Sequence, residues 1–130
     1  MKLSDTEWEV MKVLWSDKKK SFTQGEVVSG IRKRGINWAS NTIHTLLARL
    51  EKKKAVRVDK RSVPFHYSAQ VSREHCCAEA VSHFLDKAFS GSASDLLNSL
   101  INVGRVSKDE LIKLAKRFQQ NEDYNKEKGK

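Results

Sequence analysis

Three Ser/Thr-x-x-Glu patterns mark helix starts along this chain, at Ser4 to Glu7, Thr23 to Glu26 and Ser107 to Glu110. In such a capping box the first side chain accepts a hydrogen bond from a backbone amide of the first turn. The glutamate accepts one from the backbone amide of the capping residue. Because apolar residues at helical spacing follow each box, the sequence predicts a helix directly after each of them.

The first two boxes open helices with apolar stripes that predict core faces. We expect the first helix to end near Ser16, and the second, preceded by a short extended piece at Ser21 and Phe22, to end at Gly35. The inward residues are Trp8, Val10, Met11, Leu14 and Trp15 in the first helix and Val27, Val28 and Ile31 in the second.

A third helix is predicted from about Ser40, because apolar residues recur at positions i, i+3, i+4 and i+7. They are Ile43, Leu46, Leu47 and Leu50. A turn of about 100° per residue places small, polar and basic residues on the opposite face. These are Asn41, Thr45, Ala48 and Lys52, with Thr42 and Arg49 on one shoulder and His44 on the other.

Two short runs, Ala55 to Asp59 and Val63 to Ser68, predict a β-hairpin after this helix. Pro64 has no amide to donate, so it places its strand at a sheet edge or the pairing at its limit. The alternating residues are Val56 and Val58 in the first run and Phe65 and Tyr67 in the second, and Lys60, Arg61 and Ser62 form a cationic tip. The order helix, short strand, helix, helix, hairpin is that of a winged helix-turn-helix.

Three more amphipathic helices are predicted beyond Val71, over about Ser72 to Phe89, after a break at Ser90 to Ser94, and after the third capping box. The polar end, Asn121 to Lys130, is expected to fray. Their apolar faces are Cys77, Val81, Phe84, Leu85 and Ala88, then Leu96, Leu97, Leu100 and Ile101, then Leu111, Leu114, Ala115 and Phe118.

Helices of this size bury too little surface to stand alone as a monomeric domain, so we expect their faces to meet a second copy of the chain. The predicted fold is mainly α with a small β-wing. It comprises a winged-helix domain over residues 1–71, which the charge pattern below assigns to DNA binding, and a helical dimerisation region over residues 72–130.

The basic charge of the chain is concentrated in its first half. The 130 residues carry 25 Lys and Arg against 16 Asp and Glu, a formal net charge of +9. Residues 1–70 hold 15 basic and 7 acidic side chains, a net of +8, and the remainder holds 10 and 9, a net of +1. Such a surface favours phosphate, acidic lipid or an acidic protein as partner and disfavours metabolite chemistry.

The location expected from the sequence is the cytoplasm. The chain has no apolar stretch of about 20 residues that could span a bilayer, and no apolar signal core follows Met1. The adjacent Cys76 and Cys77 offer no disulfide framework, which fits a reducing compartment. We therefore expect no membrane partner.

The outward face of the third helix has the residues that read DNA in the major groove. We assign Asn41, Thr45 and Arg49 to base edges, and His44 lies among them in the first two turns. Ser40, Thr42 and Lys52 are assigned to phosphates, and Lys60 and Arg61 to the backbone or minor groove. The lysine runs 18–20 and 52–54 are equally well explained by phosphate contact or by a solvated surface.

The chain resembles the penicillinase-repressor family, often called BlaI/MecI/CopY, over nearly its full length. The resemblance rests on Leu3 to Met11 with Trp15, on Trp38 with Thr42 to Leu50, and on Phe65 and Tyr67. It implies a bacterial homodimeric repressor on a palindromic double-stranded DNA operator. In this family an antibiotic-triggered or copper-triggered signal displaces the repressor.

The departures from the family pattern concern regulation and local capping. Copper-responsive members end in Cys-x-Cys motifs, and Asn121 to Lys130 contains no cysteine. Antibiotic-responsive members are cut at an Asn-Phe bond, where this chain has Ser99-Leu100. The wing has Ser62-Val63 in place of Gly-Arg, and Ala39 replaces the residue that often caps the third helix, so we expect Ser40 to take over the cap. Neither a protease nor a metal is thereby assigned as the signal.

Other functions receive less support from the sequence. His75, Cys76, Cys77 and His83 could suggest a metal site, but neighbours 100° apart on a helix do not converge, so core roles are favoured and no cofactor is expected. Without a Gly-rich phosphate loop, a His-Glu-x-x-His motif or a nucleophile paired with a base, we expect no enzyme. The alternatives left open are a non-specific architectural DNA-binding protein and, less favoured, a protein-interaction adaptor.

Overall fold

The computed structural model describes residues 1–16 and 21–128 of the chain. In chain order the elements are α1 (Asp5–Ser16), β1 (Phe22–Thr23), α2 (Gln24–Lys33), α3 (Ser40–Lys52), β2 (Val56–Asp59), β3 (His66–Ala69), α4 (Arg73–Phe89), α5 (Ala93–Asn102) and α6 (Lys108–Lys128). Contacts within the chain define an N-terminal unit, Met1–Ser82, and a C-terminal unit, His83–Lys130.

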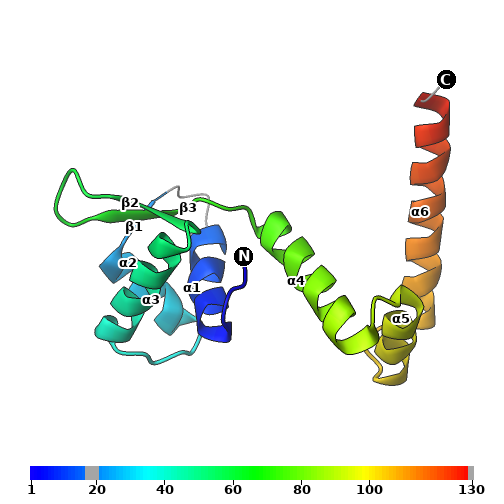
Figure 1. The fold of residues 1–130 in the computed structure, drawn as a ribbon, viewed down its shortest axis with the longest axis horizontal. Coiled ribbons are helices and arrows are strands. Elements are labelled where there is room, and N and C mark those ends of the chain that lie inside the picture. The colour runs from blue at the N-terminus through cyan, green and yellow to red at the C-terminus, as the bar shows by residue number, and fades with distance from the viewer. Residues whose placement is uncertain (17–20, 129–130) are drawn as a thin grey trace. The chain divides into compact units, whose positions relative to one another are not determined.

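The N-terminal unit is a winged helix. Its antiparallel sheet has the order β1-β3-β2, with Tyr67 of β3 paired to Phe22 on one side and to Val58 on the other. The hairpin formed by β2 and β3 projects beyond α1, α2 and α3 (Figure 1). The element order predicted from the sequence is thus confirmed, and the small sheet joins a short strand before α2 to the wing.

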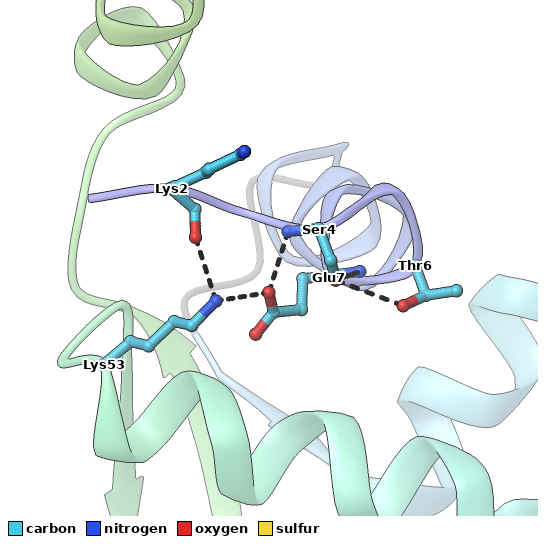
Figure 2. A network of polar contacts seen from close by, with 5 residues as sticks. All are labelled: Lys2, Ser4, Thr6, Glu7 and Lys53. Carbon is cyan, nitrogen blue, oxygen red and sulfur yellow. Dashed lines mark hydrogen bonds and ion pairs between the residues drawn. The ribbon is translucent and has the colours of Figure 1, made fainter.

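The capping boxes begin α1 and α2 as expected. Glu7 N donates to Ser4 Oγ at 3.2 Å, and Ser4 N donates to Glu7 Oε1 at 2.8 Å (Figure 2). Thr23 and Glu26 form the same reciprocal pair at α2. At the third box Ser107 Oγ accepts from Glu110 N at 3.1 Å and donates to the Glu110 carboxylate at 3.4 Å.

The core of the N-terminal unit consists of the predicted apolar faces of α1, α2 and α3. Val10, Met11, Val27, Ile31 and all four apolar residues of α3 are buried. Trp8 and Trp15 are only partly buried, and their rings pack edge to face at 5.8 Å between centroids. Trp15 Nε1 donates to Val71 O at 3.0 Å, which joins the end of α1 to the segment before α4.

Two glycines meet specific geometric demands of the helices. A Cβ on Gly30 would lie 2.5 Å from Val13 Cγ1, so only glycine permits this approach of α2 to α1. Gly35 follows the end of α2 with φ of +82°, a left-handed conformation that glycine adopts without strain. The predicted end of the second helix is therefore confirmed.

The hairpin differs from its prediction in the length of its tip. Because β3 begins at His66, Pro64 lies in the connecting loop and Phe65 is exposed, so the alternation expected from Val63 onward starts only at Tyr67. Pro64 does mark the limit of strand pairing, because the last pair at the tip is Asp59 with His66 and Pro64 lies outside it. The alternative, an edge strand, is wrong, because β3 is the central strand.

The cap of α3 also differs from its prediction. Ala39 is the N-cap residue and α3 has no side-chain cap hydrogen bond, so Ser40 does not take over that role. Ser40 is instead the first helical residue, one position too late for its hydroxyl to act as the N-cap.

The C-terminal unit contains the end of α4 with α5 and α6. Among the residues whose burial the structure describes, every buried hydrophobic lies between Leu3 and Cys76, and α5 buries none. Several apolar residues predicted to face inward are exposed here, including Phe84, Leu97, Ile101, Leu114 and Phe118, whereas Leu85, Leu96, Leu100 and Leu111 are half-buried. In α4 the buried residue is Cys76 rather than the predicted Cys77.

The boundary between the two units falls inside α4, at Ser82 and His83. The sequence placed it at residues 71 and 72, before that helix, because the winged-helix pattern ends there. The start of α4 contributes Cys76 to the core of the N-terminal unit. At the other end, α6 is helical through Lys128, including residues of the tail that was expected to fray.

Candidate nucleic-acid interface

The outward face of α3 is polar and exposed. Ile43, Leu46, Leu47 and Leu50 are buried against the core. Every residue that the sequence assigned to DNA on this helix is exposed: Ser40, Asn41, Thr42, His44, Thr45, Arg49 and Lys52. One helix therefore separates an apolar face that fixes it in the fold from a polar face with hydroxyl, amide, imidazole and guanidinium groups.

The start of α3 has no side-chain cap. Uncapped amides of the first helical turn, together with the helix dipole, favour an anion at this end. Ser40, Asn41 and Thr42 form this turn and are exposed. The geometry suits a phosphate oxygen near the beginning of the helix and leaves the following turn to other groups.

His44 is held by a residue of the preceding helix. Its Nδ1 lies 3.0 Å from Gln24 Oε1, and Gln24 Nε2 donates to Ser40 O at 3.3 Å. Gln24 is the first residue of α2, so its amide joins α2 to two positions of α3. In the sequence, Gln24 is only a spacer position between Thr23 and Glu26 of the capping box. The sequence signal that could have identified Gln24 is its position at the start of the first helix of the helix-turn-helix.

The remaining outward groups of α3 differ in how free they are. Thr45 Oγ1 donates to Asn41 O at 3.0 Å, a bond back into its own helix. The oxygen of that hydroxyl can still accept a hydrogen bond from a ligand. Arg49 and Lys52 are exposed in the last turns, and they supply positive charge next to the polar first turns.

At the wing tip, the two predicted cations are paired with acids. Arg61 binds Asp59 through Nε at 3.0 Å and NH2 at 2.8 Å, and Lys60 Nζ lies 3.4 Å from Glu51. The side-chain and backbone hydrogen bonds of Arg61 hold the pKa of Asp59 well below its usual range. The sequence missed this carboxylate, which neutralises much of the charge expected at the tip.

A shallow groove beside the wing is lined by further residues that the sequence did not single out. Arg57 of β2 and His66 of β3 line it together with Lys60 and Arg61. Arg57 is exposed, and His66 is the register partner of Asp59. The alternation of strand residues was the available signal, because Arg57 lies between the inward Val56 and Val58.

The two lysine runs, residues 18–20 and 52–54, differ in what the structure describes of them. Lys18 to Lys20 lie outside the described residues. In the second run, Lys53 Nζ binds Glu7 Oε1 and donates to Lys2 O at 2.9 Å, so this lysine has a structural role (Figure 2). Lys52 is exposed and remains available to a ligand.

The residues weighed as a metal site do not converge. Cys76 is buried in the core, and His75 Nε2 lies 3.0 Å from Glu79 Oε1. Burial, followed by the charge of Glu79, raises the pKa of the Cys76 thiol. Within residues 1–16 and 21–128, no group of three or more His, Cys, Asp or Glu side chains could hold a metal ion. Over the same residues no helix is long and apolar enough to cross a membrane.

In comparison with known proteins, residues 3–120 match the family model described as penicillinase repressor. The chain is 31% identical over 126 residues to the penicillinase repressor of Bacillus licheniformis, covering 96% of this chain and 95% of that protein. It is 28% identical over 112 residues to the methicillin resistance regulatory protein MecI of Mammaliicoccus sciuri, covering 86% and 89%.

Two solved structures are also similar to this chain. One is the solution structure of the DNA binding domain of the repressor BlaI, with 38% identity and a TM-score of 0.48, covering 55% of this chain and 84% of that one. The other is monomeric Bacillus licheniformis BlaI in complex with the blaP half-operator, with 34% identity and a TM-score of 0.47, covering 57% and 87%.

Proposed function

The chain belongs to the penicillinase repressor family of DNA-binding transcriptional repressors, and from that premise we propose that it acts as a homodimer on a palindromic operator. Each protomer places α3 in the major groove of one half-site. The two-fold symmetry of the dimer then matches the symmetry of the operator.

The single observation that supports this function most is the division of α3 into two faces. Its apolar residues are buried in the core, and its seven assigned DNA-binding residues are exposed. A recognition helix requires this arrangement, because the groove must reach side chains that the fold does not use. In the proposal, Asn41, Thr45 and Arg49 contact base edges, and Ser40, Thr42 and Lys52 contact phosphates.

The wing contributes a second contact with the duplex. Lys60 and Arg61 lie at its tip and Arg57 lies along its groove, where they can approach the backbone or minor groove. Because Asp59 and Glu51 already engage Arg61 and Lys60, these cations contact phosphate only in competition with their own acids. We therefore assign the larger part of the affinity to α3.

Dimerisation is assigned to residues 72–130, the helical region predicted from the sequence, which includes the C-terminal unit. The helices of this region expose large apolar side chains, among them Leu97, Ile101, Leu114 and Phe118. In an isolated chain this apolar surface would stay in water, which is unfavourable. A second copy of the same chain offers the same apolar faces and can cover them. This supports a homodimer with two DNA-binding units.

The regulated genes are of the type that controls antibiotic resistance or copper homeostasis, and the protein acts on DNA in the bacterial cytoplasm. The names of the relatives, a penicillinase repressor and a methicillin resistance regulator, favour the antibiotic-resistance type. Residues 121–130 contain no cysteine, the soft ligand that copper prefers.

Sedimentation of the full chain, with and without a duplex, tests the assembly. We expect a dimer, and we expect Leu97→Lys to shift it towards monomer and weaken operator binding. Asn98→Lys places the same charge on the neighbouring exposed position of α5 and should change neither property. A wild-type monomer that binds its operator with full affinity would contradict the proposal. Equal affinity for all duplexes would instead indicate a non-specific architectural protein.

A further inference from the structure

The contact between Gln24 and His44 fixes more than the position of the imidazole ring. Gln24 reaches two atoms of α3 with the two ends of one amide: Nε2 lies 3.3 Å from Ser40 O, and Oε1 lies 3.0 Å from His44 Nδ1. A backbone carbonyl oxygen only accepts hydrogen bonds, so the NH2 end of the amide must face Ser40. The carbonyl end of Gln24 consequently faces His44.

This orientation determines which nitrogen of a neutral His44 bears the proton. Gln24 Oε1 can only accept, so Nδ1 must be the N–H that donates to it. In a neutral imidazole the other nitrogen, Nε2, is then an acceptor with a free lone pair. In the described part of the chain His44 is exposed and its Nε2 has no hydrogen-bond partner.

We propose that Gln24 is a positioning residue that holds His44 in its Nδ1–H form, so that Nε2 accepts a hydrogen bond from the exocyclic amine of adenine or cytosine in the major groove. The inference rests on the proposed function, because it requires α3 to lie in that groove. It adds to it the chemical class of base that one position of the recognition helix reads.

The base preference follows from the pattern of groups in the major groove. Adenine N6 and cytosine N4 are donors there, whereas guanine presents N7 and O6 and thymine presents O4, which are all acceptors. An acceptor at His44 meets a donor at the first two bases and another acceptor at the last two. Arg49 has only donors, so the two residues read opposite chemistry from the two shoulders of the helix.

The tautomer can be measured without DNA. Long-range ¹H–¹⁵N spectra of the full chain at about pH 8, where an ordinary histidine is neutral, should show a protonated Nδ1 in His44. Gln24→Leu removes both amide contacts and should shift His44 towards the Nε2–H form that free histidine favours. Gln24→Glu keeps an acceptor beside Nδ1 and should preserve the wild-type tautomer. A protonated Nε2 in the wild type would overturn the inference.

The reading of a base is tested with a pool of duplexes of random sequence. Wild type and Gln24→Leu are each used to select binders, and each selected base is then exchanged in turn. We expect a preference for adenine or cytosine at one position of each half-site, worth about fivefold to tenfold, as for one hydrogen bond. Gln24→Leu should lose that preference and retain the others.

The two arms separate failure of this inference from failure of the proposed function. If the wild type enriches no sequence, the repressor function itself is wrong. If it enriches an operator and Gln24→Leu prefers the same bases at every position, His44 does not read a base through this tautomer. Unchanged affinity after the exocyclic amine at the base pair assigned to His44 is removed, for example by exchanging adenine for purine, would also overturn the inference.

Discussion

Lys53, the residue after α3, binds the carboxylate of Glu7 in the first turn of α1 (Figure 2). Glu7 is only 2% exposed, and its Oε1 also accepts from Ser4 N. Its other oxygen, Oε2, is buried and has no hydrogen-bond partner among the residues that the structure describes. The glutamate of the first capping box therefore also makes the ionic contact that joins the end of α3 to α1.

Removing the lysine should destabilise the N-terminal unit. Lys53→Met leaves a buried carboxylate without its cation, and we expect a loss of about 1–3 kcal/mol in the free energy of unfolding, reduced from the fully buried case because Lys53 is 38% exposed. Urea unfolding followed by tryptophan fluorescence measures it. Lys52→Met, at the exposed neighbouring position, should change stability little, and equal effects would contradict the role of the pair.

The same carboxylate predicts a dependence of stability on pH. Burial opposes ionisation of Glu7, but hydrogen bonds from Lys53 and Ser4 outweigh it and lower the pKa of this carboxyl below its ordinary value. The unfolded chain binds the proton more readily, so the stabilisation is complete above the unfolded pKa of about 4.3 and is lost as pH falls through the folded pKa.

Comparison of wild type with Glu7→Gln isolates this carboxylate from others with lowered pKa, such as Glu9 and Asp59. The stability advantage of the wild type should be constant above about pH 5 and should shrink at lower pH. Urea unfolding between pH 7 and pH 3 gives the two profiles. A difference that does not change with pH would contradict the lowered pKa of Glu7.

At the wing, Asp59→Asn should strengthen DNA binding. The substitution removes the charge that engages Arg61, so the guanidinium is free to contact a phosphate. The slope of log affinity against log salt should steepen by about 0.9 per protomer. Arg61→Ala should have a small effect in the wild type and should abolish the gain in the Asp59→Asn background. Weaker binding by Asp59→Asn would instead mean that Asp59 orients Arg61 productively.

Arg49 and Lys52 should differ in what they contribute along α3. Arg49→Ala is expected to cost about 1–3 kcal/mol on the operator and much less on unrelated duplexes, because it removes a base contact. Lys52→Ala should weaken binding to both duplexes equally and reduce the salt slope by about 0.9 per protomer. Filter binding on the two duplexes at several salt concentrations distinguishes them, and identical behaviour of the two variants would refute the assignment.

Local signals in the sequence predicted most of the winged helix. Capping boxes and apolar spacing gave the helices of the N-terminal unit, since these patterns depend only on near neighbours. The predicted length of the wing tip was wrong, because the alternation of Phe65 and Tyr67 does not indicate where β3 begins to pair with β2. The prediction that Ser40 caps α3 was wrong, because Ala39 occupies the N-cap position and Ser40 is the first helical residue.

The candidate interface was predicted less completely, for a physical reason. The exposed face of α3 follows from its buried one, so the exposed residues that are assigned to DNA could be named from spacing alone. Gln24 beside His44 and Asp59 beside Arg61 depend on how elements pack or turn. The exposed apolar residues of α5 and α6 were expected to be covered, and a single chain does not supply the surface that would cover them.

The most direct measurement is selection of binding sites by the full chain from duplexes of random sequence, followed by affinity measurement on the enriched site. We expect an inverted repeat whose half-site centres lie about 10 base pairs, or a multiple of that, apart. We also expect it to bind at least about 10³-fold more tightly than a scrambled duplex at the same salt concentration. A pool that remains random after selection, or a single half-site bound with full affinity, would contradict a symmetric repressor.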